Sequence, residues 1–424
     1  MGEMTVVVGA GLAGLACARE LARLGRPFVV LEAEGEPGGR VRSEKRDGFI
    51  LDRGFQVVLS SYDAVDALVD REALCPRYFE SGALLWHEGT FCHLANPLRH
   101  PVLLPQTLLA FPPGDSLRIS ALVAEVLVRQ DADLLAGCGR PGDQSTRAFL
   151  EERGFGQSFL RRFAVPFFGG VLLDADLETS AALFRYYLKK FSLGRAFLPL
   201  EGMVGLPRLL AARLTGHRLR LGEEVSSIQV RSHRAESLKF ADGTEIPVEA
   251  VVIASDAGSA GKLLGVNARQ PLFRRVWQLA WTSPEPLTSA RMLILPAGRR
   301  IVRHLTQITN VAPGYSPSGR PLLVASVLEG GTAGDAALAA AARREVCEIF
   351  PTCSDKLELV DIRRVDRAVI HQPPGFLAKK KTFDHPANII LAGDYLSTSS
   401  IESAMASGER AARRVLRCVE SLHG

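Results

Sequence analysis

The sequence lacks several patterns that identify whole classes of protein. Its seven cysteines, at positions 17, 75, 92, 138, 347, 353 and 418, form no C-x-x-C pair and no regular framework, which favours reduced thiols in a cytoplasmic protein. No uninterrupted apolar run reaches the length of about eighteen residues that a membrane-spanning helix needs. The apolar N-terminus has no basic leader, so we expect no secretion signal.

Strong charge and the usual side-chain signatures of hydrolysis are also missing. The chain has 51 basic and 46 acidic residues, a net charge of +5, so no nucleic-acid partner is expected. Its nine histidines include no H-x-x-x-H pair, and we predict no metal site. No Ser/His/Asp or Cys/His signature is present, and the catalytic side chains cannot be named. With 424 residues and 47% hydrophobic content, the chain is long enough for two domains.

Glycines supply the main positive signal, at the very start of the chain. A β-rich run over residues 5–8 leads into Gly9, Gly11 and Gly14, and an apolar helical stretch follows over residues 15–24. The first glycine permits a tight turn, the second removes the Cβ that would block a pyrophosphate, and the third lets the helix pack on the strand. The helix start then offers free N–H groups to phosphates. This pattern predicts a dinucleotide site.

An acidic residue follows at the expected distance. A second strand over residues 27–31 ends at Glu32, about twenty residues past the glycines, where a carboxylate can bind a ribose hydroxyl. The carboxylate suits an unphosphorylated ribose, so NADP is disfavoured. A second glycine pair, Gly38 and Gly39, precedes Arg40, a cation that can face a pyrophosphate. A site for a nicotinamide dinucleotide does not need this second phosphate-binding stretch.

Residues 9–56, which include Gly54, Phe55 and Gln56, resemble the FAD-binding half of the flavin amine oxidase superfamily, with its phytoene desaturase-like and protoporphyrinogen oxidase-like enzymes. Residues 219–255, 388–394 and 399–408 match the same superfamily. The resemblance implies that Asp394 contacts the ribityl-phosphate region, that the last helix directs its N-terminus at the flavin, and that Val225 meets the adenine through its backbone. The FAD-binding residues it implies are Gly9, Gly11, Leu12, Ala13, Gly14, Glu32, Ala33, Gly39, Arg40, Val41, Gly54, Phe55, Gln56, Val225, Ala254, Gly393, Asp394, Ser400 and Ile401.

The predicted fold is α/β (α+β overall), with a Rossmann-like FAD-binding domain and a substrate domain of mixed sheet plus helices. Strands near the start, between 219 and 255, and at 388–393 have to meet in one sheet, so the FAD-binding domain is discontinuous. We assign residues 1–75, 200–262 and 365–424 to the FAD-binding domain, and residues 76–199 and 263–364 to the substrate domain.

Local patterns predict elements of the substrate domain. Helices are expected over residues 115–128 and 145–153, and strands over residues 291–295, 301–308 and 322–328. Asp335 is a suitable N-cap for an alanine-rich helix, and the glycine run at 330–334 is interpreted as a turn before it. Near the C-terminus, Ser399 and Glu402 are expected to form a capping box.

One apolar segment, residues 94–113, is interrupted by five prolines. We expect it to be a buried loop over a lipophilic channel, with peripheral contact to a membrane surface as the alternative.

The chemistry expected of the site is hydride transfer to a flavin, for which the cofactor carries the electronic step. Amine oxidases of this superfamily usually place two aromatic side chains around the substrate nitrogen, in front of the flavin. The resemblance implies an aromatic residue at one of these two positions, but this sequence has Ser400 there. The covalent-flavin cysteine is also absent, so FAD should be noncovalent. We therefore favour a desaturase or dehydrogenase of a bulky apolar, isoprenoid-like or carotenoid-like substrate. The alternatives are an amine or protoporphyrinogen oxidase and a non-catalytic FAD-binding protein.

Residues that could line the substrate cavity are mainly aromatic. His304 and His371 are possible polar members. The partners expected are a lipophilic substrate and an electron acceptor such as oxygen or a quinone, and the oligomeric state is left open. The candidate aromatic residues are Phe163, Phe167, Phe168, Phe191, Phe197, Trp277 and Trp281.

Overall fold

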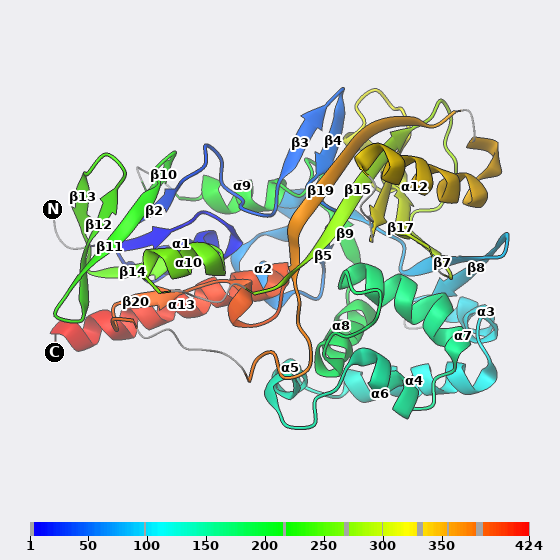
Figure 1. The fold of residues 1–424 in the computed structure, drawn as a ribbon, viewed down its shortest axis with the longest axis horizontal. Coiled ribbons are helices and arrows are strands. Elements are labelled where there is room, and N and C mark those ends of the chain that lie inside the picture. Colours follow the sequence, from blue (N-terminus) through cyan, green and yellow to red (C-terminus); the bar gives the residue numbers. More distant parts are fainter. Residues whose placement is uncertain are drawn as a thin grey trace.

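The computed structural model describes residues 4–96, 99–214, 218–266, 271–298, 300–328, 334–353, 356–378 and 385–423. Two regions of different architecture lie side by side in Figure 1. One contains a parallel sheet and both ends of the described chain. The other contains a larger mixed sheet with helices gathered below it. The predicted α/β arrangement, Rossmann-like in one part and mixed-sheet plus helical in the other, is confirmed.

A five-stranded parallel sheet is the centre of the first region, with the strand order β10-β2-β1-β14-β20. Its central strands are rich in valine and isoleucine and buried on both faces, as parallel sheets require. Three distant parts of the chain meet here, as the sequence predicted. The strands are β10 (Leu219–Leu221), β2 (Phe28–Glu32), β1 (Thr5–Val8), β14 (Ala250–Ile253) and β20 (Ile389–Leu391).

Alternate side chains of these strands enter two separate cores. Val7 and Val252 pack on one face beneath α1 (Leu12–Arg23) and α13 (Ile401–His423). Val6 and Val251 pack on the other face against the three-stranded sheet β11-β12-β13. The two helices approach closely, since a Cβ on Gly408 of α13 would lie 2.0 Å from the carbonyl oxygen of Ala13 in α1. The three-stranded sheet contains β11 (Val225–Arg231), β12 (Arg234–Phe240) and β13 (Glu245–Pro247).

A seven-stranded mixed sheet organises the second region, with the order β19-β15-β18-β17-β16-β7-β8. The helix α12 (Asp335–Ile349) packs on one face of it through Leu338 and Val346, against Leu279 and Trp281. The strands predicted near 291–295, 301–308 and 322–328 are β16, β17 and β18. The bounds are β19 (Glu358–Ile370), β15 (Phe273–Thr282), β18 (Leu322–Val327), β17 (Val302–Gln307), β16 (Leu293–Pro296), β7 (Gly82–His87) and β8 (Thr90–Ala95).

Helices between residues 104 and 193 form the rest of this region. The predicted helices near 115–128 and 145–153 are α4 and α6, and the side chain of Ser145 caps α6 by accepting the N–H of Ala148. A π-helical stretch over Leu160–Gly169 contains Pro166. The helices are α3 (Leu104–Leu109), α4 (Pro113–Leu127), α5 (Asp131–Ala136), α6 (Thr146–Glu152), α7 (Gln157–Phe159) and α8 (Ala181–Leu193).

Three local predictions were wrong. Residues 94–113 are not a loop throughout, because α3 forms within them, with Pro105 in the first turn where its missing N–H costs nothing. Asp335 is the first residue of α12 and Gly334 precedes it as the N-cap. The third error, at the start of α13, is described with the site. The glycine run expected at 330–334 lies almost wholly outside the described residues.

Within the described ranges, no helix is both long enough and apolar enough to cross a membrane.

Candidate functional site

The first glycine turn is shaped by its neighbours in the sheet. Gly9 follows β1 with φ +106°, and its N–H donates to the carbonyl of Leu31 at 2.7 Å. A Cβ on Gly9 would lie 3.0 Å from the carbonyl oxygen of Ala254, and one on Gly14 would lie 1.9 Å from that of Gly9. Both positions therefore require glycine for the turn itself, before any ligand is considered.

Gly11 has a different role. A Cβ there would meet nothing within 4 Å, so the fold alone does not demand glycine at this position. The second glycine pair lies against this turn, because the N–H of Gly38 donates to the carbonyl of Ala10 at 2.9 Å and a Cβ on Gly39 would lie 3.3 Å from the Cα of Gly11. No side chain caps the start of α1. Two stretches of bare backbone and a helix N-terminus thus face one space, as anion binding needs.

Glu32 is held at the end of β2 by backbone groups. Its carboxylate accepts the N–H of Ala10 at 2.6 Å and the N–H of Glu34 at 3.0 Å, and the residue is only 8% exposed. These bonds fix the carboxylate beside the glycine turn, where it lines the same cavity as Ala33.

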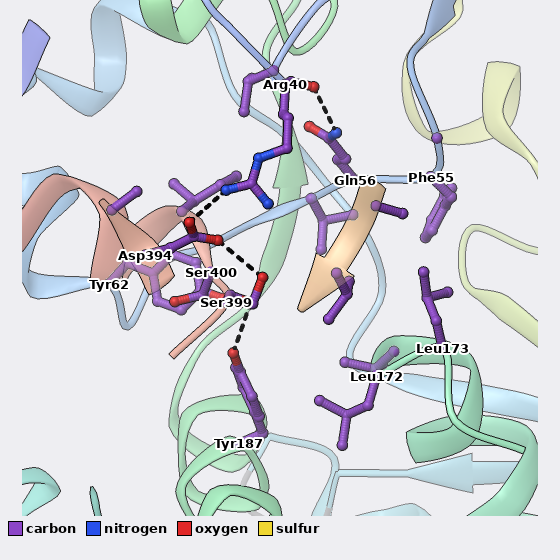
Figure 2. A pocket seen from close by; sticks show the side chains of 18 of the residues that line it. Arg40, Phe55, Gln56, Tyr62, Leu172, Leu173, Tyr187, Asp394, Ser399 and Ser400 are labelled. Atoms are coloured by element: carbon purple, nitrogen blue, oxygen red, sulfur yellow. Dashed lines mark hydrogen bonds and ion pairs between the residues drawn. The ribbon is translucent and has the colours of Figure 1, made fainter. Parts of the chain in front are cut away.

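A chain of polar contacts crosses the cavity wall (Figure 2). Arg40 makes an ion pair with Asp394 at 2.5 Å, and the other Asp394 oxygen accepts the hydroxyl of Ser399 at 2.9 Å. The hydroxyl of Tyr187 donates to the carbonyl of Ser399 at 3.3 Å. The arginine is 43% exposed while the aspartate is 7% exposed, so a buried carboxylate orients a cation that extends into the open part of the site.

The capping box predicted for α13 is not formed. Ser400 caps the helix instead, its hydroxyl accepting the N–H of Ser403 at 3.0 Å. The hydroxyl of Ser399 donates a hydrogen bond to Asp394. The carboxylate of Glu402 accepts a hydrogen bond from the N–H of Ala64 in α2 (Asp63–Leu68). Tertiary partners therefore compete successfully for both side chains, and the helix begins one residue later.

Gln56 lies beside Arg40, and only one of its two polar side-chain atoms makes a hydrogen bond among the described residues. Its amide nitrogen donates to the carbonyls of Arg40 at 3.2 Å and Arg53 at 3.0 Å. Its amide oxygen is buried and has no hydrogen-bond partner among the described residues. The neighbouring Gly54 gives its N–H to Gln278 at 2.6 Å. A buried acceptor on a cavity wall is costly unless a ligand or water supplies a donor.

One cavity of about 1450 Å³ is lined by both glycine turns and by Glu32, Arg40, Gln56 and Asp394. A pocket for one small ligand usually measures about 300–1,000 Å³, so this space suits a cofactor and a substrate together. Every predicted site residue except Gly14 lines it. Gly14 lies below the turn, where its contact with Gly9 explains it.

The far part of the cavity is apolar. Its residues come from the connection between α3 and α4, from α7 and α8, and from the π-helical stretch. We define this apolar half by Phe111, Phe159, Phe163, Phe167, Phe168 and Phe191. Their rings contact one another, with Phe163 stacked on Phe167 at a centroid distance of 5.5 Å. Three of the predicted lining aromatics are not found there, because Phe197, Trp277 and Trp281 are buried in the packed cores.

His304 does line the cavity, and His371 does not. The imidazole of His304 contacts the carbonyl of Phe167 through Nε2 at 3.1 Å and lies beside Phe55, at a centroid distance of 6.3 Å. Burial lowers the pKa of His304 from 6.5 to about 4. The side chain is therefore neutral near pH 7, consistent with a dry apolar half.

Two tyrosines at the junction of the polar and apolar parts escaped the sequence analysis. Tyr62 and Tyr187 lie near Ser399 and Ser400 in Figure 2. Burial raises the pKa of both phenols, so both hydroxyls remain protonated near pH 7. Leu172 and Leu173 line the opposite side, and the backbone of Leu173 is left-handed, with φ +52°. No motif marked any of these four.

No group of three or more histidine, cysteine or acidic side chains is placed to hold a metal ion among the residues with described positions.

A family model described as flavin containing amine oxidoreductase matches residues 12–416. The chain belongs to this family. Membership confirms the resemblance found in the sequence and assigns the protein to the flavin-dependent oxidoreductases. The match begins just after Gly9 and Gly11 and includes Arg40, Asp394 and most of α13, so it covers most of the cavity just described.

Similar proteins of this family include carotenoid enzymes. The phytoene dehydrogenase of Streptomyces griseus is 29% identical over 303 residues, which cover 64% of this chain and 57% of that protein. The zeta-carotene-forming phytoene desaturase of Myxococcus xanthus is 26% identical over 329 residues, 70% of this chain and 61% of that one. Both alignments span less than two thirds of the relative. An oxidoreductase from Methanosarcina mazei has the same fold, with a TM-score of 0.75 at 17% identity over 96% of this chain and 99% of that one.

Proposed function

We propose that the protein binds FAD noncovalently and oxidises a bulky apolar substrate, of isoprenoid or carotenoid type, as a desaturase or dehydrogenase. The segments 1–75, 200–262 and 365–424 would form the FAD-binding part, and the segments 76–199 and 263–364 the substrate part. The observation that carries the proposal is a single cavity with a glycine-lined polar part and the apolar half.

The polar part fits FAD on several independent grounds. Bare backbone at Gly11 and Gly39 leaves room for a pyrophosphate, and Arg40 supplies a cation there. Glu32 offers a fixed acceptor for a ribose hydroxyl, and the unpartnered oxygen of Gln56 offers a second acceptor. None of the seven cysteines forms a disulfide and none lines the cavity, which favours noncovalent binding over a cysteinyl linkage.

The apolar half would hold and orient the substrate by excluding water from it. A flavin held in the polar part would supply the hydride-accepting chemistry, and an acceptor such as oxygen or a quinone would then take up the electrons. The chain's own contribution is positional: the phenylalanines would contact an apolar substrate, and the N-terminus of α13 lines the cavity through Ser400 and Ile401, where its dipole would favour negative charge. The neutral imidazole of His304 adds no charge to the apolar half. We also propose a cytoplasmic location, which the lack of disulfides among the seven cysteines supports.

The decisive experiment is anaerobic reduction of the purified yellow protein by different substrate classes. A polyene or isoprenoid extract should bleach the flavin absorbance, and mass analysis should find a product two hydrogens lighter. Simple amines should leave the absorbance unchanged. Bleaching by amines alone would contradict the proposed substrate class while leaving FAD binding intact.

Amine oxidation is the second candidate, because Tyr62 and Tyr187 supply aromatic rings near Ser400 that the sequence did not reveal. If the two rings frame a substrate nitrogen, amines should bleach the flavin and a Tyr187→Leu variant should lose that reaction. Under the favoured proposal the same variant should still be reduced by polyene.

A further inference from the structure

We propose that residues 99–103, α3 and an exposed stripe along α4, formed by Leu117, Ala121, Ala124 and Val128, are a docking surface for an anionic lipid bilayer. The surface would admit the lipophilic substrate directly from the membrane into the apolar half of the cavity. This inference rests on the proposed function for its substrate, but its first test does not depend on turnover.

Apolar side chains project into solvent on this surface. Val102, Leu109, Leu117 and Val128 are 87%, 84%, 73% and 84% exposed, more than any other large apolar side chain described. Isolated exposed apolar residues are ordinary, but a cluster on neighbouring elements marks an interaction site. These elements lie at the end of the molecule away from both termini (Figure 1).

The exposed apolar residues of α4 form a continuous stripe along the helix. Leu117, Ala121, Ala124 and Val128 follow one another at intervals of three or four residues and are all exposed. Such spacing places them on one helix face. On the inner side of the same helix, Leu122 and Val126 are buried. The helix is thus apolar on two sides, and only one of them is covered by the protein.

The cavity opens beside this stripe. Leu108, Ser120 and Ala124 line the cavity and are also exposed to solvent, so they mark an opening between α3 and α4. Phe111 and Val123 continue the lining inward. An apolar molecule that left a bilayer here would pass from lipid to the apolar half along apolar side chains.

The charged side chains around this surface indicate which lipid headgroups it would bind. Arg99, His100, Arg118 and Arg129 are exposed beside the apolar side chains. The nearest acids are partly neutralised, since Asp115 is buried against Arg118, and Glu125 pairs with Arg153 and Arg185. Asp133, on the next helix along the chain, is exposed as well. The excess of cations favours anionic over zwitterionic lipid.

The test is co-sedimentation of the flavin-loaded protein with vesicles. Wild type should bind vesicles of phosphatidylglycerol and phosphatidylcholine and bind pure phosphatidylcholine less. The combined variant Leu109→Ser, Leu117→Ser, Val128→Ser should bind at least about tenfold more weakly, because each serine removes an apolar anchor. The matched control, Val230→Ser, Leu272→Ser, Leu359→Ser, changes exposed apolar residues elsewhere and should bind like wild type.

Three results would overturn the proposal: wild type that stays in the supernatant, a triple serine variant that sediments like wild type, or a dimer that the same substitutions convert to monomer. The last would make the surface a contact between copies of the chain. Vesicle binding needs no turnover, so it separates this inference from the proposed function. A second readout follows if both hold: the variant should lose oxidation of vesicle-embedded polyene and keep oxidation of detergent-solubilised polyene.

Discussion

The two parts of the cavity are built in opposite ways. The polar part is made of backbone, with Gly9, Gly11 and Gly39 removing side chains and Glu32 and Asp394 fixed by hydrogen bonds. The apolar half is made of side chains that helices bring together from distant positions. A binding site formed by backbone tolerates few substitutions, and many enzymes can use it for the same ligand. A binding site formed by side chains can change its substrate specificity through single substitutions.

The sharpest test of the backbone part is Gly11→Val. A Cβ there would meet no protein atom within 4 Å, so we expect folding to be unaffected, whereas the side chain would occupy the space proposed for the pyrophosphate. FAD affinity should fall by about a hundredfold or more, and the purified protein should be colourless. Gly35→Val is the control, since it too has open space around it but lies outside the cavity lining, and it should stay yellow. A yellow Gly11→Val protein would remove the basis of the cofactor assignment.

A pH titration of stability tests how dry the apolar half is. Because the pKa of His304 is lowered from 6.5 to about 4, the unfolded chain binds the proton more readily between these values. The free energy of unfolding should therefore decrease as the pH falls, by about 2 kcal/mol from this group between pH 7 and pH 5. Urea unfolding of His304→Gln should show a correspondingly weaker pH dependence, and His100→Gln, at an exposed site, should behave like wild type. Equal pH dependence in all three proteins would mean that water reaches the imidazole.

A substitution that narrows the apolar half should lower turnover of a bulky substrate and leave FAD binding unchanged. Val123→Trp places a large ring on the cavity side of α4. The value of kcat/KM for a bulky polyene should fall about tenfold, with FAD content unchanged. Ala340→Trp, on the exposed face of α12, serves as the control for the added ring. If Val123→Trp loses flavin as well, the two parts of the cavity are not independent.

The smallest expected effect comes from the exposed cation. Arg40→Ala removes a charge that is 43% exposed and leaves Asp394 without its ion pair. FAD affinity should weaken about fivefold, equal to about 1 kcal/mol, as expected for a charge partly screened by water. Measured by flavin titration at low and high salt, the loss should shrink as salt increases. Arg208→Ala, which disrupts an exposed ion pair with Glu36, should leave FAD binding unchanged.

The sequence predicted the polar part well because its constraints are local. Gly9, Gly11 and Gly14 act within one turn, and their spacing is visible without knowledge of the fold. The apolar half left no comparable signal, since a phenylalanine on a cavity wall and one in a packed core look the same in sequence. Hence Phe163 and Phe167 were placed correctly while Trp277 and Trp281 were not.

Tertiary competition explains the errors in local structure. Ser399 and Glu402 have the right spacing for a capping box, but Asp394 and the N–H of Ala64 are better placed partners. Tyr62 and Tyr187 were missed for a related reason, because only the packing of α2 and α8 beside Ser399 brings them to the site. Neither contact could be inferred before the fold was known.

The packing of α13 on α1 also constrains synthesis of the protein. α1 carries the glycine turn and is made first, yet its surface at Ala13 stays uncovered until Gly408 has emerged from the ribosome. β1 likewise gains its β14 neighbour only after residue 253, and β14 gains β20 only after residue 391. The cavity therefore stays unfinished through nearly all of translation. We expect a stop codon shortly before residue 401 to yield aggregated, flavin-free protein rather than a smaller functional one.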